Sequence, residues 1–99
     1  MYRGSTPTLV FNLPIPADQL ETAYVTIAQL GRTIIDKPLA ECEADGADLR
    51  VRLTQEETLK LIAKTSAKVQ FRGKTITGDV IPSKIFEVMP EQILHDGVI

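Results

Sequence analysis

The sequence predicts an all-β fold, a sandwich of about seven short strands with one short helix inserted between two of them. Turn-forming residues recur at intervals of about 8–12 residues, which is the spacing typical of sandwiches and barrels. Between these turns apolar and polar residues alternate, as in strands with one buried face. The alternation changes to a helix-start pattern in the segment LRVRLTQEETLKL.

That segment carries the clearest change of period in the chain. Its first half alternates apolar residues with Arg50 and Arg52, which indicates a half-buried strand. Thr54 then precedes Glu57 by three residues, which is the spacing of a helix-capping box. We therefore expect a short helix over residues 54–62 that crosses from one sheet to the other.

The first half of the chain predicts three strands and an acidic segment. Strands are expected at 8–13 and 23–29, which alternate, and at 33–37, which returns from the turn and ends before Pro38. Residues 30–32, Leu-Gly-Arg, suit a hairpin turn because glycine supplies a positive φ. Residues 41–47 are acidic and contain a glycine, so they indicate a loop or a weak edge segment.

The second half predicts strands at 48–53, 67–72, 74–81 and 83–89. Gly73 and Lys74 are expected to form a tight turn, and Gly78 suggests a bulge or kink in the strand that follows. Residues 90–94 could form one turn of helix before an apolar end.

A chain of 99 residues predicts a single domain, residues 1–99. The strand pattern is immunoglobulin-like in architecture, although the chain has no Trp and one Cys, so the tryptophan and disulfide of antibody domains are absent. The alternative fold is a two-layer α+β arrangement.

Composition argues against several classes of function. The formal net charge is −2. The outward basic residues fall on two strands that a sandwich would place in opposite sheets, Arg50 and Arg52 on one and Lys68, Arg72 and Lys74 on the other, so we expect no nucleic-acid binding. No stretch approaches the ~18 apolar residues of a membrane span, and MYRGSTPT is not a signal peptide. We expect no membrane association and a soluble protein made in a cytoplasm.

The residue types that carry chemistry are sparse. His95 is the one histidine and lies near the end of the chain, where a triad or metal site would lack rigid partners. Cys42 sits between Glu41 and Glu43, and neighbouring carboxylates raise a thiol pKa, which opposes nucleophilic reactivity. The acidic segment lacks the pattern of a calcium loop. We therefore expect no catalytic residues, no metal site and no cofactor.

The two ends and one strand carry the candidates for partner binding. An apolar segment near a terminus packs either on its own domain in cis or on a neighbour in trans, and the sequence leaves both open. Tyr24 lies opposite the apolar face of its strand, so it faces either solvent or a partner. The candidate partner-binding residues are Tyr2, Arg3, Tyr24, Ile93, Leu94, Val98 and Ile99.

Three segments carry a family resemblance: RGSTPT at 3–8, LTQEETL at 53–59 and EQILHDGVI at 91–99. In order and spacing they resemble small proteins encoded by phages and prophages of Gram-positive bacteria. In outline the chain is similar to the immunoglobulin-like modules of phage baseplate and tail proteins. The resemblance supplies no catalytic residues to carry over.

This resemblance implies a non-enzymatic phage or prophage structural or assembly module that acts by protein–protein docking. Its partners would be other phage proteins or further copies of itself, which leaves a homo-oligomer open. It would be made in the bacterial host cytoplasm and could enter the virion. The alternative function is a small ligand- or glycan-binding β module, for which Tyr2 and Tyr24 are the candidate aromatic platforms.

Overall fold

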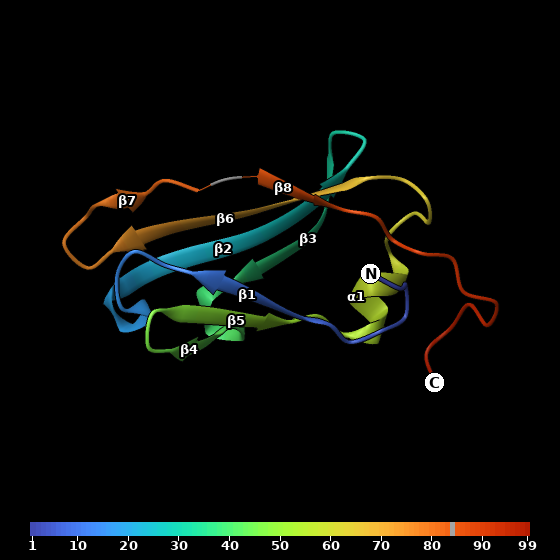
Figure 1. Ribbon diagram of the computed structural model, residues 1–99, viewed down its shortest axis with the longest axis horizontal. Coiled ribbons are helices and arrows are strands. Elements are labelled where there is room, and N and C mark those ends of the chain that lie inside the picture. The colour runs from blue at the N-terminus through green and yellow to red at the C-terminus, as the bar shows by residue number, and fades with distance from the viewer. Residues whose placement is uncertain (84) are drawn as a thin grey trace.

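Two antiparallel sheets pack face to face in the computed structural model, which describes residues 1–83 and 85–99 (Figure 1). The smaller sheet has the order β1-β5-β4, formed by β1 (Thr8–Asn12), β5 (Asp48–Arg52) and β4 (Glu43–Asp45). The larger sheet has the order β3-β2-β6-β7, and β8 also pairs with β6. Its strands are β3 (Arg32–Pro38), β2 (Leu20–Gln29), β6 (Ala67–Thr75), β7 (Val80–Ile81) and β8 (Ile85–Val88). The predicted all-β sandwich is confirmed.

The helix α1 (Gln55–Leu59) connects β5 of the smaller sheet to β6 of the larger one, so it is the predicted crossover. Two short 3₁₀ turns, η1 (Ala17–Gln19) and η2 (Leu39–Glu41), complete the assigned elements. Both predicted halves of the capping box form: Thr54 Oγ1 accepts a hydrogen bond from the Glu57 backbone N–H (3.1 Å), and Glu57 Oε1 accepts one from the Thr54 N–H (2.8 Å).

The core lies between the two sheets. It consists of the residues that point inward at alternate positions along each strand. Burying each large aliphatic side chain contributes about 1.5–3 kcal/mol, so these residues dominate the stability of the domain. The largest apolar side chains that are fully buried are Val25, Ile27, Leu49, Val51, Leu53, Leu61 and Val69. Phe11 closes one side of the sandwich, because its ring centroid lies 5.7 Å from that of Phe71 and 5.9 Å from that of Phe86.

The hairpin between β2 and β3 is confirmed at the predicted residues. Leu30 and Gly31 have φ values of 52° and 74°, and two consecutive positive φ angles are characteristic of the tight turns that match strand twist. The strand β2 extends three residues before the predicted start, with the predicted faces: Ala23, Val25 and Ile27 are buried.

The helix is shorter than predicted, and the reason is a side chain from β2. The Gln29 carboxamide accepts a hydrogen bond from the Ile62 N–H (2.8 Å) and donates to the Ile62 carbonyl (3.0 Å). It also donates to the Thr65 carbonyl (2.9 Å). These contacts hold residues 62–65 outside the helix, and the Ile62 side chain is left exposed rather than in the core.

The predicted turn at Gly73 and Lys74 is wrong. Gly73 lies inside β6, and a Cβ atom there would be 2.6 Å from Phe71 Cζ and 3.0 Å from Leu20 Cδ2. The glycine therefore makes room for the Phe71 ring. The turn comes later, at Gly78 with φ 93°, where the Gly78 N–H donates to the Thr75 carbonyl (2.9 Å).

The end of the chain also differs from the prediction. The last predicted strand, 83–89, is observed as β8, and Lys84 lies outside the described residues. The predicted helical turn at 90–94 does not form. Glu91 pairs instead with Tyr2 in an isolated parallel bridge, because this segment satisfies its backbone groups on the opposite end of the chain.

Candidate functional site

Both ends of the chain lie beside α1 at one end of the sandwich (Figure 1). The Glu91 N–H donates to the Met1 carbonyl (2.6 Å), and the Arg3 N–H donates to the Glu91 carbonyl (3.3 Å). Pro90 is fully buried, and its carbonyl accepts a hydrogen bond from the Lys64 N–H (2.8 Å). The backbone of the C-terminal segment is therefore fixed in cis on its own domain.

Arg3 joins these parts through its guanidinium. Nε donates to the Leu61 carbonyl (2.6 Å) and Nη2 donates to the Leu59 carbonyl (2.7 Å). Carbonyls at a helix C-terminus lack intrahelical donors, and a cation there also complements the helix dipole. Nη2 also forms an ion pair with Asp96 Oδ1 (3.0 Å), so a single side chain ties the N-terminal segment, α1 and the C-terminal segment together.

Gln55 fixes the last described residue. The Ile99 N–H donates to Gln55 Oε1 (2.9 Å), and Gln55 Nε2 donates to the Ile99 carbonyl (3.2 Å). This pair of hydrogen bonds holds the Ile99 backbone against the first turn of α1.

The apolar side chains of this region divide into two groups. Ile93 turns inward, where its Cδ1 lies close to Gly4 and near Leu59. The others face outward, with exposed fractions of 101% for Leu94, 91% for Ile99, 62% for Tyr2 and 55% for Val98. We call these four outward residues the terminal surface. Six of the seven candidate residues thus lie at this end of the molecule. Four of them form the terminal surface, and the other two, Arg3 and Ile93, contact the domain itself.

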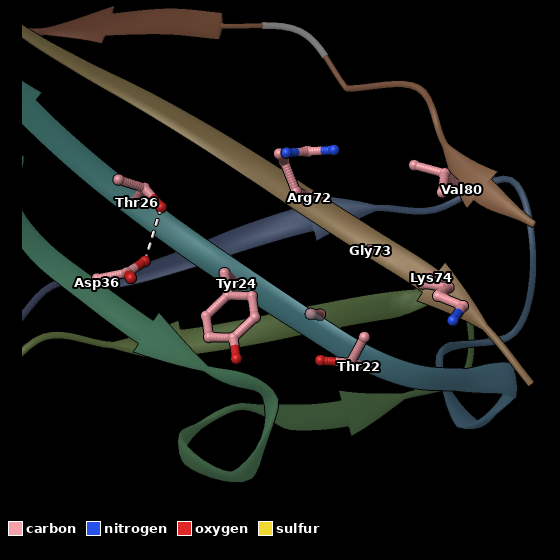
Figure 2. Close-up of a pocket in the computed structure, with 9 residues that line it drawn as sticks. Thr22, Tyr24, Thr26, Asp36, Arg72, Gly73, Lys74 and Val80 are labelled. Atoms are coloured by element: carbon pink, nitrogen blue, oxygen red, sulfur yellow. Dashed lines mark hydrogen bonds between the residues drawn. The ribbon is translucent and has the colours of Figure 1, made fainter. Parts of the chain in front are cut away.

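Tyr24, the seventh candidate, lies elsewhere, on the outer face of the larger sheet (Figure 2). Its side chain is 48% exposed and stands directly across from Arg72 in the β2–β6 ladder. Here the sheet carries a hollow of about 420 Å³, which we call the outer hollow. The residues that line the outer hollow include Tyr24, Thr26, Asp36, Arg72, Lys74 and Val80.

The charged side chains of the outer hollow differ in whether they have a partner within the chain. Asp36 Oδ1 accepts a hydrogen bond from Thr26 Oγ1 (2.7 Å), which occupies one oxygen of its carboxylate. Among the described residues the ion pairs are Arg3–Asp96, Lys37–Glu57 and Arg50–Asp45. Arg72 and Lys74 therefore have no ion-pair partner within this part of the chain.

Only two titratable groups of the described chain have clearly shifted pKa values. Burial raises the pKa of the Cys42 thiol, with a smaller contribution from Glu41, partly opposed by Lys37. The direction agrees with the sequence prediction, but the main cause is burial. Burial opposes ionisation of Glu57, yet hydrogen bonds and charge attraction from Lys37, with hydrogen bonds from Thr54, outweigh it and lower the pKa of this carboxyl.

These two groups form no acid–base pair. Glu57 Oε1 contacts Lys37 Nζ at 2.9 Å in a bridge between α1 and β3, so its charge is used in joining two elements. A thiol with a raised pKa is mostly protonated and a weak nucleophile. Within residues 1–83 and 85–99, no group of three His, Cys, Asp or Glu side chains is placed to hold a metal ion.

Sequence reasoning missed the buried polar residues that hold α1 and the segment after it. Gln29 and Lys37 are buried at inward positions of their strands, two residues after the buried Ile27 and Ile35 on the same faces. A polar residue at an inward position of an alternating strand is the pattern that could have found them. Arg72 and Lys74 were recognised as surface cations, but their position beside Tyr24 depends on strand pairing.

Comparison of the chain with known protein families, curated protein sequences and solved structures finds no match in any of the three. Among the described residues no helix has both the length and the apolar character needed to cross a membrane.

Proposed function

We propose that this protein is a non-enzymatic structural or assembly module that docks onto other proteins through its terminal surface. The resemblance to small phage and prophage proteins supports a place for it in virion assembly, with other phage proteins or further copies of itself as partners. One observation carries the proposal: the backbone of the C-terminal segment is fixed, while its large apolar side chains face solvent.

The combination matters because binding normally loses free energy in ordering mobile groups. In the terminal surface this loss is reduced, since Arg3 and Gln55 already hold the segment that carries Leu94 and Ile99. A simple hydrophobic cap would pack those side chains against its own domain, as Ile93 packs near Gly4. An ordered apolar patch directed outward is typical of a surface that a partner covers.

The test is the solution mass of the purified protein by light scattering, for wild type and for the variant Leu94→Ser/Ile99→Ser. The substitutions leave the backbone hydrogen bonds of Ile99 intact, so the domain should remain folded. We expect wild type to form a multimer that persists at high salt, because apolar contacts are not screened. At high salt the variant should be monomeric, with an unchanged far-UV circular dichroism spectrum.

Ile76→Ser is the matched control, because Ile76 is equally apolar, is exposed, and lies in the β6–β7 turn rather than at the α1 end. It should leave the mass unchanged. If wild type is a monomer, the partner must be another phage protein. The immobilised chain should then capture a phage protein from an infected-cell extract, and failure to capture one would overturn the proposal. A multimer that survives the double substitution at high salt contradicts docking through the terminal surface.

A second candidate function is glycan binding, favoured by Tyr24 in the outer hollow. Sugars stack on exposed aromatic rings, and the hollow adds the polar side chains of Thr26, Asp36 and Arg72 around that ring. A glycan array probed with wild type and with Tyr24→Ala tests this candidate. Binding that disappears in the variant supports it, and an array without hits removes it.

A further inference from the structure

The charges around the outer hollow favour an anionic occupant over a neutral sugar. Arg72 and Lys74 point outward from alternate positions of β6, and the exposed Lys68 extends the same row. Against them stand Asp36, one oxygen of which binds Thr26, and Glu87 on β8. The lining of the hollow therefore carries two cations, Arg72 and Lys74, against one carboxylate, that of Asp36.

The opposite charge lies in the other sheet, in the hairpin of residues 41–48, which we call the acidic hairpin. Its edge strand β4 is exposed at all three residues, and Glu43 and Asp45 occupy alternate positions. Asp45 contacts Arg50 at 3.3 Å, but both side chains are well exposed, so that pair is weak. Glu43 has no ion-pair partner among the described residues.

The two charge pairs have matching geometry. Alternate residues of a strand are about 6.8 Å apart, because each residue advances the chain by about 3.4 Å. Glu43 and Asp45 are therefore spaced like Arg72 and Lys74, since each pair occupies positions i and i+2 of one strand. An extended acidic strand laid along β6 would bring both carboxylates opposite both cations at once.

We infer that the outer hollow binds the acidic hairpin of a second copy of this chain. Glu43 and Asp45 of one copy pair with Arg72 and Lys74 of the next, and the Tyr24 ring supplies apolar area between them. The arginine fork suits a carboxylate, and the tyrosine hydroxyl is a further donor to it. The inference rests on the proposed assembly role but uses a different surface.

The contact is head-to-tail, because the hollow and the acidic hairpin lie in different sheets of one copy. Such heterologous contacts leave a free hollow at one end and a free hairpin at the other, so they generate rings or open filaments. The growing assembly should therefore show a mass that rises with protein concentration. The assembly should also dissociate as salt is added, because at 1 M ionic strength exposed charges are screened beyond about 3 Å.

The experiment is a charge swap followed by sedimentation velocity at low and high salt. One variant is Arg72→Glu/Lys74→Glu, and the other is Glu43→Lys/Asp45→Lys. At low salt wild type should sediment as larger species than it does at high salt, and each variant alone should lose this salt-dependent increase in size. An equimolar mixture of the two variants should regain the large species, because each reversed surface then meets its complement.

Arg32→Glu/Lys64→Glu is the matched control, since it makes the same change in net charge at exposed positions outside the hollow and should associate like wild type. A wild-type monomer at low salt, or variants that associate like wild type, would overturn the inference. Failure of the mixture to associate would do so as well.

The two proposals fail separately. Association that persists at high salt and is lost in Leu94→Ser/Ile99→Ser supports the terminal surface and not the acidic contact. Salt-sensitive association lost only in the charge variants supports the acidic contact and contradicts the terminal surface as the self-association site. Binding of a neutral glycan that Arg72→Glu/Lys74→Glu leaves intact would assign the hollow to a sugar instead.

Discussion

The α1 end of the molecule and the outer hollow use their polar side chains in opposite ways. At the α1 end Arg3, Gln29 and Lys37 reach backbone carbonyls or a carboxylate of the same chain. At the outer hollow Arg72 and Lys74 reach no acidic partner within the described chain. Residues of similar chemistry thus stabilise the fold in one region and remain available to a partner in the other.

The difference shows why charge alone does not identify a binding residue. A buried or half-buried polar group must be satisfied internally, because an unpaired one loses its hydrogen bonds to water. An exposed cation keeps its hydration until a partner arrives, so it has little effect on stability. Substitutions at the α1 end should therefore alter unfolding, whereas substitutions at the hollow should alter association.

Gln29→Leu should have the largest effect on stability, about 4 kcal/mol, because it leaves three backbone groups of Ile62 and Thr65 without their partner. Each buried group left unsatisfied costs about 1–3 kcal/mol. Urea unfolding followed by circular dichroism measures the change. Leu30→Ser, at the neighbouring exposed turn, is the control and should unfold like wild type. A loss below about 1 kcal/mol for Gln29→Leu would show that water replaces the carboxamide.

Removing either partner of the Lys37–Glu57 pair should have unequal effects. Glu57→Ala leaves the buried Lys37 ammonium uncompensated and also removes half of the capping box, so we expect a loss of about 3 kcal/mol. Lys37→Met leaves a carboxylate that is partly exposed and still bound to the Thr54 N–H, so its loss should be about 1 kcal/mol. Equal losses in urea unfolding would contradict the role of burial in this asymmetry.

The same pair predicts the sign of a pH effect. The pKa of Glu57 is lowered in the folded state from its ordinary value of 4.5, so the folded protein favours the ionised carboxylate. Its contribution to stability is complete above that ordinary value and is lost as pH falls through the lowered pKa. On acidification the thermal unfolding temperature of wild type should therefore fall more than that of Glu57→Gln. Parallel pH profiles for the two proteins would contradict this.

Arg3→Ala should lower the free energy of unfolding by about 2 kcal/mol, because the Leu59 and Leu61 carbonyls lose a charged donor. It should also release the C-terminal segment from Asp96, so hydrogen exchange at residues 91–99 should speed up. Asp96→Asn is the control: it weakens the exposed ion pair but leaves both carbonyl hydrogen bonds, so its effect on unfolding should be small. Unchanged exchange in Arg3→Ala would contradict the tie between the two ends.

Local patterns predicted much of the fold. The faces of β2, the turn at Gly31 and the capping box at Thr54 all depend on residues within a few positions of one another. Gly73 could not be interpreted in this way, because what keeps it in a strand is its pairing with Ala23 of β2, fifty residues earlier. The helix end was missed for the same reason, since Gln29 is thirty-three residues before Ile62.

The candidate sites were predictable only as residue types. The apolar residues after 90 marked a terminal surface, but the sequence left open whether the segment lies in cis, because the contact of Arg3 with Asp96 joins the two ends of the chain. Strand alternation placed Tyr24 and Arg72 on outward faces. Only the pairing of β2 with β6 shows that they are direct neighbours and form one hollow.

Arg72→Ala should have the smallest effect on stability, within about 0.5 kcal/mol of wild type, although it removes the same side chain as Arg3→Ala. The two arginines therefore form an internal comparison in which residue type is constant and only the surroundings differ. Arg72 has no ion-pair partner in the described chain, so its loss leaves no group unsatisfied. Urea unfolding of both variants under one condition measures the difference. A loss at Arg72 as large as that at Arg3 would mean that the outer hollow stabilises the fold, and its cations would then not be free for a partner.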